Sequence, residues 1–171
     1  MSSHFSQLQW HTSLDPLLKL RVRSPVDAFS YNRLASSDAL MASGLQGDGL
    51  WLELRGTTVF SPFAGSFSRK NHTGQHLQFM HSNGLKLVVD FPLYCQSKHG
   101  LGFHWLVGEQ ALVQAGQPIL HYDKALLSQA DQSFGILLRV APHSRIHSIH
   151  CRTGYHQALQ DDLLAIQLVS A

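Results

Sequence analysis

One alternating stretch, from Gly84 to Phe91, most constrains what this chain can fold into. It reads G-L-K-L-V-V-D-F, with leucine or valine at the odd positions 85, 87 and 89. A period of two is typical of a β-strand with one apolar face. Asp90 ends the other face, where a carboxylate is costly to bury unless it is paired, hydrogen-bonded or close to solvent. The reason for an aspartate at position 90 therefore bears on function.

Short strand-like segments separated by turn residues recur along the rest of the chain. Gly, Pro and Asn punctuate them, which favours an antiparallel sheet structure over alternating strands and helices. We predict an all-β fold, a compact antiparallel β-sandwich or barrel, with strands near residues 20–23, 50–54, 59–60, 77–80, 84–91, 119–122, 135–140 and 164–169. A few short helices are expected near residues 103–107, 124–130 and 142–149.

Two strand-like segments end in the same dipeptide, Ser24-Pro25 and Ser61-Pro62. Two such corners indicate a duplicated β-motif. Residues 1–19 look like a separate N-terminal arm, whose partly helical spacing is interrupted by Pro16. We therefore divide the chain into an arm, 1–19, and one β-domain, 20–171.

Composition excludes several classes of protein. With 171 residues, 44% of them hydrophobic and 14% charged, the chain can bury a real core and is not a disordered protein. A formal charge of +2 gives no argument for nucleic acid or an anionic membrane as partner. No apolar run reaches the roughly 18 residues of a membrane span, and no signal peptide is visible. Two cysteines form no disulfide framework, so we expect a cytoplasmic protein.

Several segments, in order and spacing, resemble the glucose-type enzyme IIA of the bacterial phosphotransferase system. They are Ser24-Pro25, 47–49 (G-D-G), 61–65 (S-P-F-A-G), 82–84 (S-N-G), 100–103 (G-L-G-F) and 113–123 (V-Q-A-G-Q-P-I-L-H-Y-D). The resemblance runs from about residue 20 to the C-terminus. It implies a β-sandwich of the duplicated hybrid motif type, and partners within the sugar phosphotransferase system. No cofactor is expected.

The resemblance also locates a site. Members of this family carry a phosphoryl group on one histidine, supported by a second, and pass it from a small carrier protein to a sugar permease domain. Here the matched acceptor position is Asp90 and the supporting position is Gln75, although Thr73 is kept. We therefore expect a catalytically degenerate pseudoenzyme with no phosphohistidine, in which the Gln75 amide donates to Asp90 as a structural pair.

The alternative is an active phosphocarrier with a relocated acceptor, His76 or Asp90. His76 follows Gln75 directly, and neighbouring side chains in a strand point to opposite faces. His76 is thus expected to reach the site only if the strand register shifts by one residue. Phosphorylation of Asp90 itself normally needs Mg²⁺, and no acidic cluster accompanies it in the sequence.

Apolar residues at positions matched to the family's docking face indicate how a partner would bind. A rim of exposed apolar side chains would keep a regulatory role plausible without catalysis, through contact with a carrier protein of the phosphotransferase system or another cytoplasmic protein. The alternative is that these residues belong to the edge of the core. The residues are Leu40, Met41, Leu45, Leu87 and Val88.

Histidines 143, 147 and 150 recur at i, i+4 and i+7, so on a helix they share one face. Imidazoles suit zinc, and a histidine-rich metal- or small-ligand-binding domain is a further alternative function. The sequence around His143, His147 and His150 contains no carboxylate that could orient them as metal ligands. We interpret them as a solvated histidine face and predict no metal site.

Overall fold

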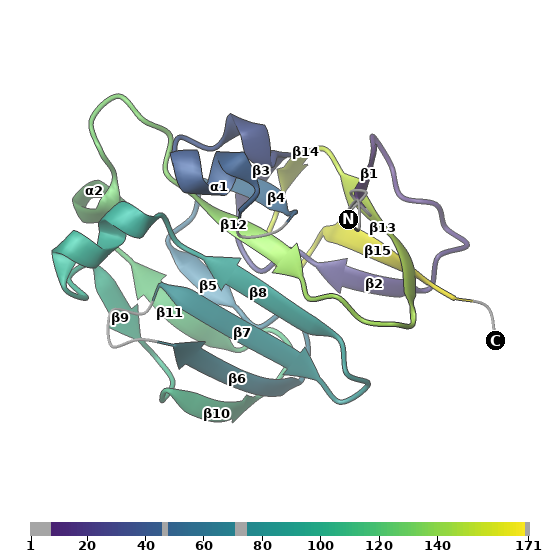
Figure 1. Ribbon diagram of the computed structural model, residues 1–171. Helices are drawn as coiled ribbons and strands as arrows, with labels where there is room; N and C mark the ends of the chain where they lie inside the picture. Colours follow the sequence, from purple (N-terminus) through teal and green to yellow (C-terminus); the bar gives the residue numbers. More distant parts are fainter. Residues whose placement is uncertain (1–7, 46–47, 71–74, 170–171) are drawn as a thin grey trace.

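The computed structural model describes residues 8–45, 48–70 and 75–169, and they form a mostly β fold of three sheets (Figure 1). The eight-stranded sheet has the order β10 (Gln110–Val113), β6 (Gly65–Lys70), β7 (His76–His81), β8 (Lys86–Asp90), β12 (Gly135–Val140), β4 (Leu50–Leu54), β3 (Ala28–Asn32) and β14 (Gly154–His156). A four-stranded sheet has the order β1 (Leu8–His11), β13 (Ile146–Arg152), β15 (Asp162–Leu168) and β2 (Leu20–Arg23). A three-stranded sheet has the order β5 (Thr58–Phe60), β11 (Pro118–Tyr122) and β9 (Phe103–Trp105). The predicted all-β class is confirmed.

Four short helical segments lie between strands: η1 (Arg33–Ala35), α1 (Ala39–Ser43), η2 (Leu93–Lys98) and α2 (Lys124–Leu127). α1 begins where Asp38 Oδ1 accepts hydrogen bonds from the N–H groups of Leu40 and Met41, and it ends at the left-handed Gly44. An aspartate before and a glycine after a helix are ordinary start and stop signals. Among the described helices, none is long and apolar enough to cross a membrane.

Two of the three predicted helices are wrong. Residues 103–105 form β9, where His104 lies opposite His121 of β11, and residues 146–152 form β13 between β1 and β15. Cross-strand pairing outweighs a helical spacing read from a few residues. The helix expected near 124–130 is present as Lys124–Leu127.

The two Ser-Pro corners have the same local structure, as a duplicated motif requires. Each serine hydroxyl donates to the carbonyl two residues ahead, at 2.6 Å for Ser24 and 2.7 Å for Ser61. The Ser24 N–H donates to the Asp161 carbonyl and the Ser61 N–H to the Gln117 carbonyl, both at 2.9 Å. Both serines are buried, so these bonds satisfy polar groups inside the fold.

One buried apolar cluster joins the three sheets, with members such as Val22 of β2, Leu87 of β8 and Leu120 of β11. The four residues of β1 run parallel to β13 at the edge of the four-stranded sheet, and Trp10 packs against this cluster. Residues 8–11 of the arm are therefore strand rather than helix.

Candidate functional site

Asp90 lies at the end of β8 with both carboxylate oxygens occupied. Oδ1 contacts His76 Nδ1 at 2.5 Å, and Oδ2 accepts from Arg139 Nη2 at 2.5 Å and Nε at 3.2 Å. The side chain of Asp90 is 9% exposed, whereas those of His76 and Arg139 are 24% and 22% exposed. The buried charge is thus paired and hydrogen-bonded, which is what burial of a carboxylate demands. We call these three residues the Asp90 triad.

Sheet register brings the triad together. β8 lies between β7 and β12, as Figure 1 shows, and His76 is the residue directly opposite Asp90 in the β7–β8 ladder. Directly opposed residues of an antiparallel pair point to the same face. Arg139 of β12 lies opposite Val88, two residues before Asp90, which is within reach of a long side chain.

The expected geometry of positions 75 and 76 is therefore wrong. His76 reaches Asp90 without any slip, because β7 begins at His76 and Gln75 precedes the strand. Gln75 is buried, its carbonyl accepts from Phe91 N–H at 2.8 Å, and its Nε2 has no hydrogen-bond partner among the described residues. The predicted Gln75–Asp90 pair does not form. Thr73 lies outside the described residues.

Gln78, two residues along β7, contacts the imidazole nitrogen that does not face Asp90. Its amide Nε2 lies 2.9 Å from His76 Nε2. An amide nitrogen can donate but not accept, so His76 Nε2 accepts and carries a lone pair. The ring proton is then on Nδ1, which donates to Asp90. The two contacts orient the ring, and Nε2 is the nitrogen that faces away from Asp90.

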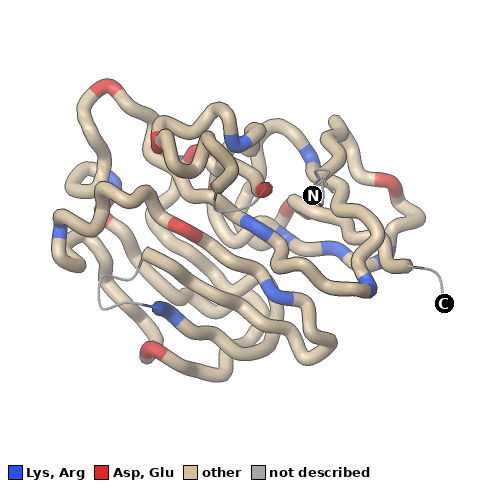
Figure 2. Tube along the Cα trace, in the orientation of Figure 1, with Lys and Arg blue, Asp and Glu red and all other residues tan. Residues whose placement is uncertain are grey.

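Charge in the triad is balanced. One carboxylate and one guanidinium cancel, so the aspartate does not leave a net negative field in front of the imidazole. Elsewhere in the described part of the chain, acidic and basic positions are interspersed, with Lys and Arg more frequent toward β2 and β12 (Figure 2). Cys95, in η2 shortly after Asp90, is no competing nucleophile, because burial raises the pKa of its thiol to about 12.

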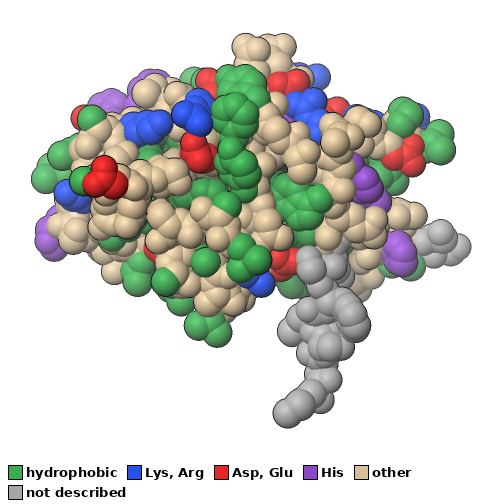
Figure 3. All heavy atoms as spheres, turned by 90° about the horizontal axis from the view of Figure 1, so that it is seen from above, with side chains coloured by type: hydrophobic (Ala, Val, Ile, Leu, Met, Phe, Trp, Pro, Cys, Tyr) green, Lys and Arg blue, Asp and Glu red, His purple; other side chains and the backbone are tan. Residues whose placement is uncertain are grey.

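The residues proposed for an apolar docking rim divide into two groups. Met41, Leu87 and Val88 are buried, so these three belong to the interior rather than to a rim. Leu45 is 82% exposed, and Leu40 is partly exposed. Figure 3 shows hydrophobic side chains on the upper face of the molecule, interspersed with charged ones.

Leu93 of η2 extends that rim and was not foreseen. It is 48% exposed, and its N–H donates to Asp38 Oδ2 at 2.9 Å. Because Asp38 also caps α1, this carboxylate ties η2 to the start of α1. Leu40, Leu45 and Leu93 therefore form what we call the leucine rim.

The three histidines predicted to share a helix face do not do so. His143 precedes β13, and His147 and His150 are three residues apart in that strand, so they point to opposite faces. His150 Nδ1 instead lies 2.9 Å from His11 Nε2 on β1. Within the described ranges, no three His, Cys, Asp or Glu side chains gather as a metal site would require.

Sequence reasoning missed Arg139 and Gln78. A signal for Arg139 was present: β12 reads G-I-L-L-R-V, an apolar strand with one charge near its end, as Asp90 is near the end of β8. Lone opposite charges at the ends of two apolar strands favour a partnership, because neither is buried cheaply alone. Gln78 gave no comparable signal.

Comparisons with known proteins agree with this fold. The sequence profile of the family described as "phosphoenolpyruvate-dependent sugar phosphotransferase system, EIIA 1" matches residues 20–145, well over half of the chain. The N-acetylglucosamine-specific EIICBA component of Escherichia coli K12 is 35% identical over 86 residues, covering 50% of this chain and 13% of that protein. The glucose-specific EIIA component of Bacillus cereus is 26% identical over 96 residues, covering 56% of this chain and 58% of that protein.

Among solved structures, glucose permease IIA from Mycoplasma capricolum superposes with a TM-score of 0.73 at 17% identity, covering 85% of this chain and 94% of that one. This likeness concerns the fold. The chain spans less than two thirds of the length of both curated relatives.

Proposed function

This chain belongs to the EIIA type 1 family of the phosphoenolpyruvate-dependent sugar phosphotransferase system, and from that premise we propose that it is a phosphocarrier whose acceptor is His76. One observation carries the proposal: His76 Nδ1 is bonded to Asp90 at the position where the family resemblance places the acceptor. A histidine nucleophile needs a defined tautomer, and a hydrogen-bonded carboxylate supplies it.

The reaction uses His76 Nε2. Its lone pair attacks the phosphorus of a phosphorylated carrier protein, and the donor's bond to phosphorus breaks as the new N–P bond forms. The Nδ1 proton stays in the hydrogen bond to Asp90, which stabilises the positive charge that develops on the ring. Gln78 must rotate away, since its amide occupies Nε2 in the resting state.

Arg139 offsets the negative charge that Asp90 places beside the acceptor histidine. A carboxylate beside an acceptor repels an incoming phosphoryl group, but the Arg139 guanidinium neutralises Asp90 and lies within the same cluster. Guanidinium groups also suit phosphoryl oxygens geometrically. Asp90 is less suited to be the acceptor itself, because both of its oxygens are already bonded.

The test is phosphoryl transfer from phosphoenolpyruvate through the two general carriers of the system. We expect labelling at His76, abolished in His76→Gln and slowed about a hundredfold in Asp90→Asn, which misorients the ring. His147→Gln is the matched control, because His147 is exposed and far along the chain on β13. An acid-labile and alkali-stable label identifies phosphohistidine rather than acyl phosphate. Labelling that persists in His76→Gln contradicts the proposal.

A second candidate is the catalytically degenerate docking module. The observation in its favour is that the Asp90 triad is satisfied internally while the leucine rim is exposed beside α1 and η2. In that case the folded wild type takes no label at all, yet still binds a phosphotransferase-system protein. Substituting Leu45 and Leu93 by Ser would then weaken binding, because each exposes a large apolar surface. A cytoplasmic location is part of both proposals.

A further inference from the structure

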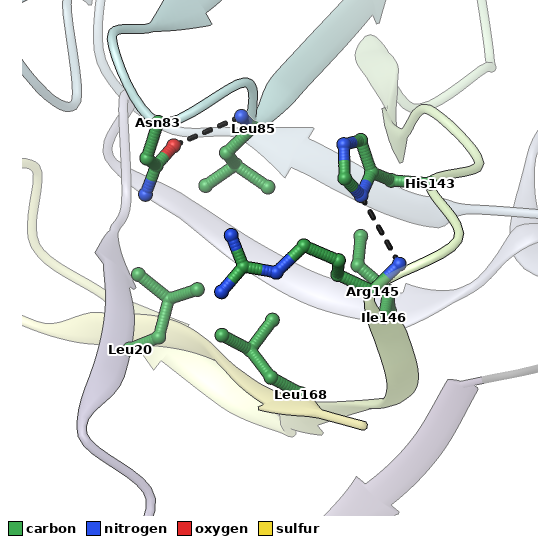
Figure 4. Close-up of a pocket in the computed structure, with 7 residues that line it drawn as sticks. All are labelled: Leu20, Asn83, Leu85, His143, Arg145, Ile146 and Leu168. Carbon is green, nitrogen blue, oxygen red and sulfur yellow. Dashed lines mark hydrogen bonds between the residues drawn. The ribbon is translucent and has the colours of Figure 1, made fainter. Parts of the chain in front are cut away.

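A pocket far from the Asp90 triad has the lining of an anion site with an apolar floor. It lies between the β7–β8 turn, the segment before β13 and the facing ends of β2 and β15, and its volume is about 80 Å³ (Figure 4). Its walls are Leu20, Leu85, Ile146 and Leu168. By the ~15 Å³ that one water needs, the pocket has room for about five water-sized groups.

The polar groups at this pocket present donors. Asn83 Oδ1 already accepts from Leu85 N–H at 2.9 Å, which leaves the Asn83 amide N–H groups. His143 Nδ1 accepts from Arg145 N–H at 3.2 Å, which leaves an N–H on Nε2. The acceptor atoms of Asn83 and His143 are thus already hydrogen-bonded to backbone N–H groups, and their remaining polar groups are donors.

Arg145 supplies the positive charge. Its side chain reaches across the pocket toward Asn83 and Leu20, as Figure 4 shows. Within the part of the chain that the structure describes, no hydrogen bond or ion pair engages its guanidinium. Five N–H donors with a full charge therefore face a small apolar recess.

We propose that this pocket binds a carboxylate carrying a short branched alkyl chain. The alkyl group fills the recess between the leucines and Ile146, and the carboxylate accepts from Arg145, Asn83 and His143. Arg145 is exposed, so a neutral molecule would leave its guanidinium to water and would gain no charge-assisted hydrogen bond, and a plain anion such as acetate would leave the apolar walls in water. The same chemistry belongs to a free short-chain acid and to the C-terminal leucine of a peptide.

The site is separate from the proposed phosphoryl acceptor. Leu85 precedes β8, whose last residue is Asp90, so the two sites are about 17 Å apart at the ~3.4 Å rise of a strand. The proposal holds whether or not His76 carries a phosphoryl group, and its test needs no phosphoryl donor.

The experiment is a titration of the full chain followed by the backbone amide signals of Leu85 and Ile146. The probes are isovalerate, isoamyl alcohol, acetate, and a tripeptide ending in leucine with a free or an amidated C-terminus. We expect saturable binding of isovalerate, at least about tenfold weaker binding of the alcohol and of acetate, and a similar loss in Arg145→Gln. Lys19→Gln is the control, because it removes the same charge from an exposed residue next to Leu20.

Each outcome decides something. Binding of isovalerate alone assigns a free acid, and binding of the free but not the amidated peptide assigns a chain end. No saturable binding of either overturns the proposal. It is equally overturned if the alcohol binds as well as the acid, or if Arg145→Gln, with an otherwise native spectrum, binds as well as the wild type.

Discussion

Asp90 is held by residues that are distant from it in the sequence. A carboxylate at 9% exposure needs partners, and they come from two other strands, as His76 and Arg139. In the alternation of residues 84–91, Asp90 stands out because burying a carboxylate without partners costs free energy. The structure shows that its partners lie on the neighbouring strands of the sheet, and that the predicted hydrogen bond from Gln75 is not formed.

At this scale we predict that Asp90→Asn destabilises the fold by about 2 kcal/mol. The substitution keeps the shape and leaves the Arg139 guanidinium without its charged partner. The cost stays below that of a fully buried pair, because Arg139 is 22% exposed and can be partly hydrated. Chemical denaturation monitored by circular dichroism measures it.

Glu53→Gln is the matched control for that prediction. It makes the same carboxylate-to-amide change in a pair with Arg55, whose side chain is 47% exposed. Exposed pairs contribute about 0–1 kcal/mol. Equal losses in Asp90→Asn and Glu53→Gln would contradict the role given to the triad.

His156 makes stability depend on pH. Its side chain is buried, and burial followed by the charge of Arg152 lowers its pKa below the ordinary 6.5, although Asp161 acts in the opposite direction. The unfolded chain therefore binds a proton first as the pH falls. The contribution of His156 is fully present above about pH 6.5 and is lost as the pH falls toward its lower folded pKa.

We therefore expect the free energy of unfolding to decrease from about pH 7 to pH 5, with a shallower decrease in His156→Gln. Each variant is compared with itself at the two pH values, so a general loss of stability in His156→Gln does not affect the slope. His147→Gln, at an exposed position, should keep the wild-type slope. A slope in His156→Gln as steep as in the wild type would refute the assignment.

At the scale of elements, the β6–β7 pairing depends on the absence of a side chain at Gly65. Gly65 lies opposite His81 in that ladder, and a Cβ there would come 2.1 Å from the Met80 carbonyl oxygen. The atoms that this Cβ would meet belong to the backbone of Met80 and His81, which cannot move aside as the end of a flexible side chain can. Gly65→Ala should cost about 2 kcal/mol or more and loosen the hairpin whose other strand begins at His76.

Gly108→Ala provides the comparison. A Cβ at Gly108 meets only the Gln110 carbonyl oxygen, at an ordinary 3.7 Å, and its backbone is not in the left-handed region. We expect a change within about 0.5 kcal/mol in thermal or chemical unfolding. Amide hydrogen exchange in β7 should speed up in Gly65→Ala and stay unchanged in Gly108→Ala.

How far the sequence predicts these elements depends on where the information lies. Strands 20–23, 50–54 and 135–140 follow from local alternation and turn residues, and the structure has them at those bounds. β9 and β13 were misassigned because their partners are distant in sequence, and pairing rather than propensity decides them. The side of the sheet that His76 faces could not be predicted from alternation alone for the same reason. That prediction requires the β7–β8 register, in which His76 lies opposite Asp90.

For the whole molecule, one core joins three sheets. Residues of all three contribute to a single buried cluster, while Met41, Trp51 and Leu137 form a small second cluster involving α1. The resemblance to a known family predicted this architecture better than hydrophobic periodicity did. The resemblance uses the order and spacing of whole segments, such as the two Ser-Pro corners at Ser24 and Ser61, whereas periodicity uses only a few neighbouring residues. A core shared in this way should unfold as one unit.

The three tryptophans make that prediction testable, since each belongs to a different sheet. Trp10 is in β1, Trp51 in β4 and Trp105 in β9. In three variants that keep one tryptophan and replace the other two by Phe, fluorescence reports on a single sheet. We expect the urea midpoint from fluorescence to coincide with that from far-ultraviolet circular dichroism in each variant, because no sheet can lose its buried face without exposing the others. Comparing the two probes within a variant removes the effect of the substitutions on stability. A Trp105 signal that changes before the circular dichroism would mean that the three-stranded sheet opens independently, and the shared core would then not enforce cooperative unfolding.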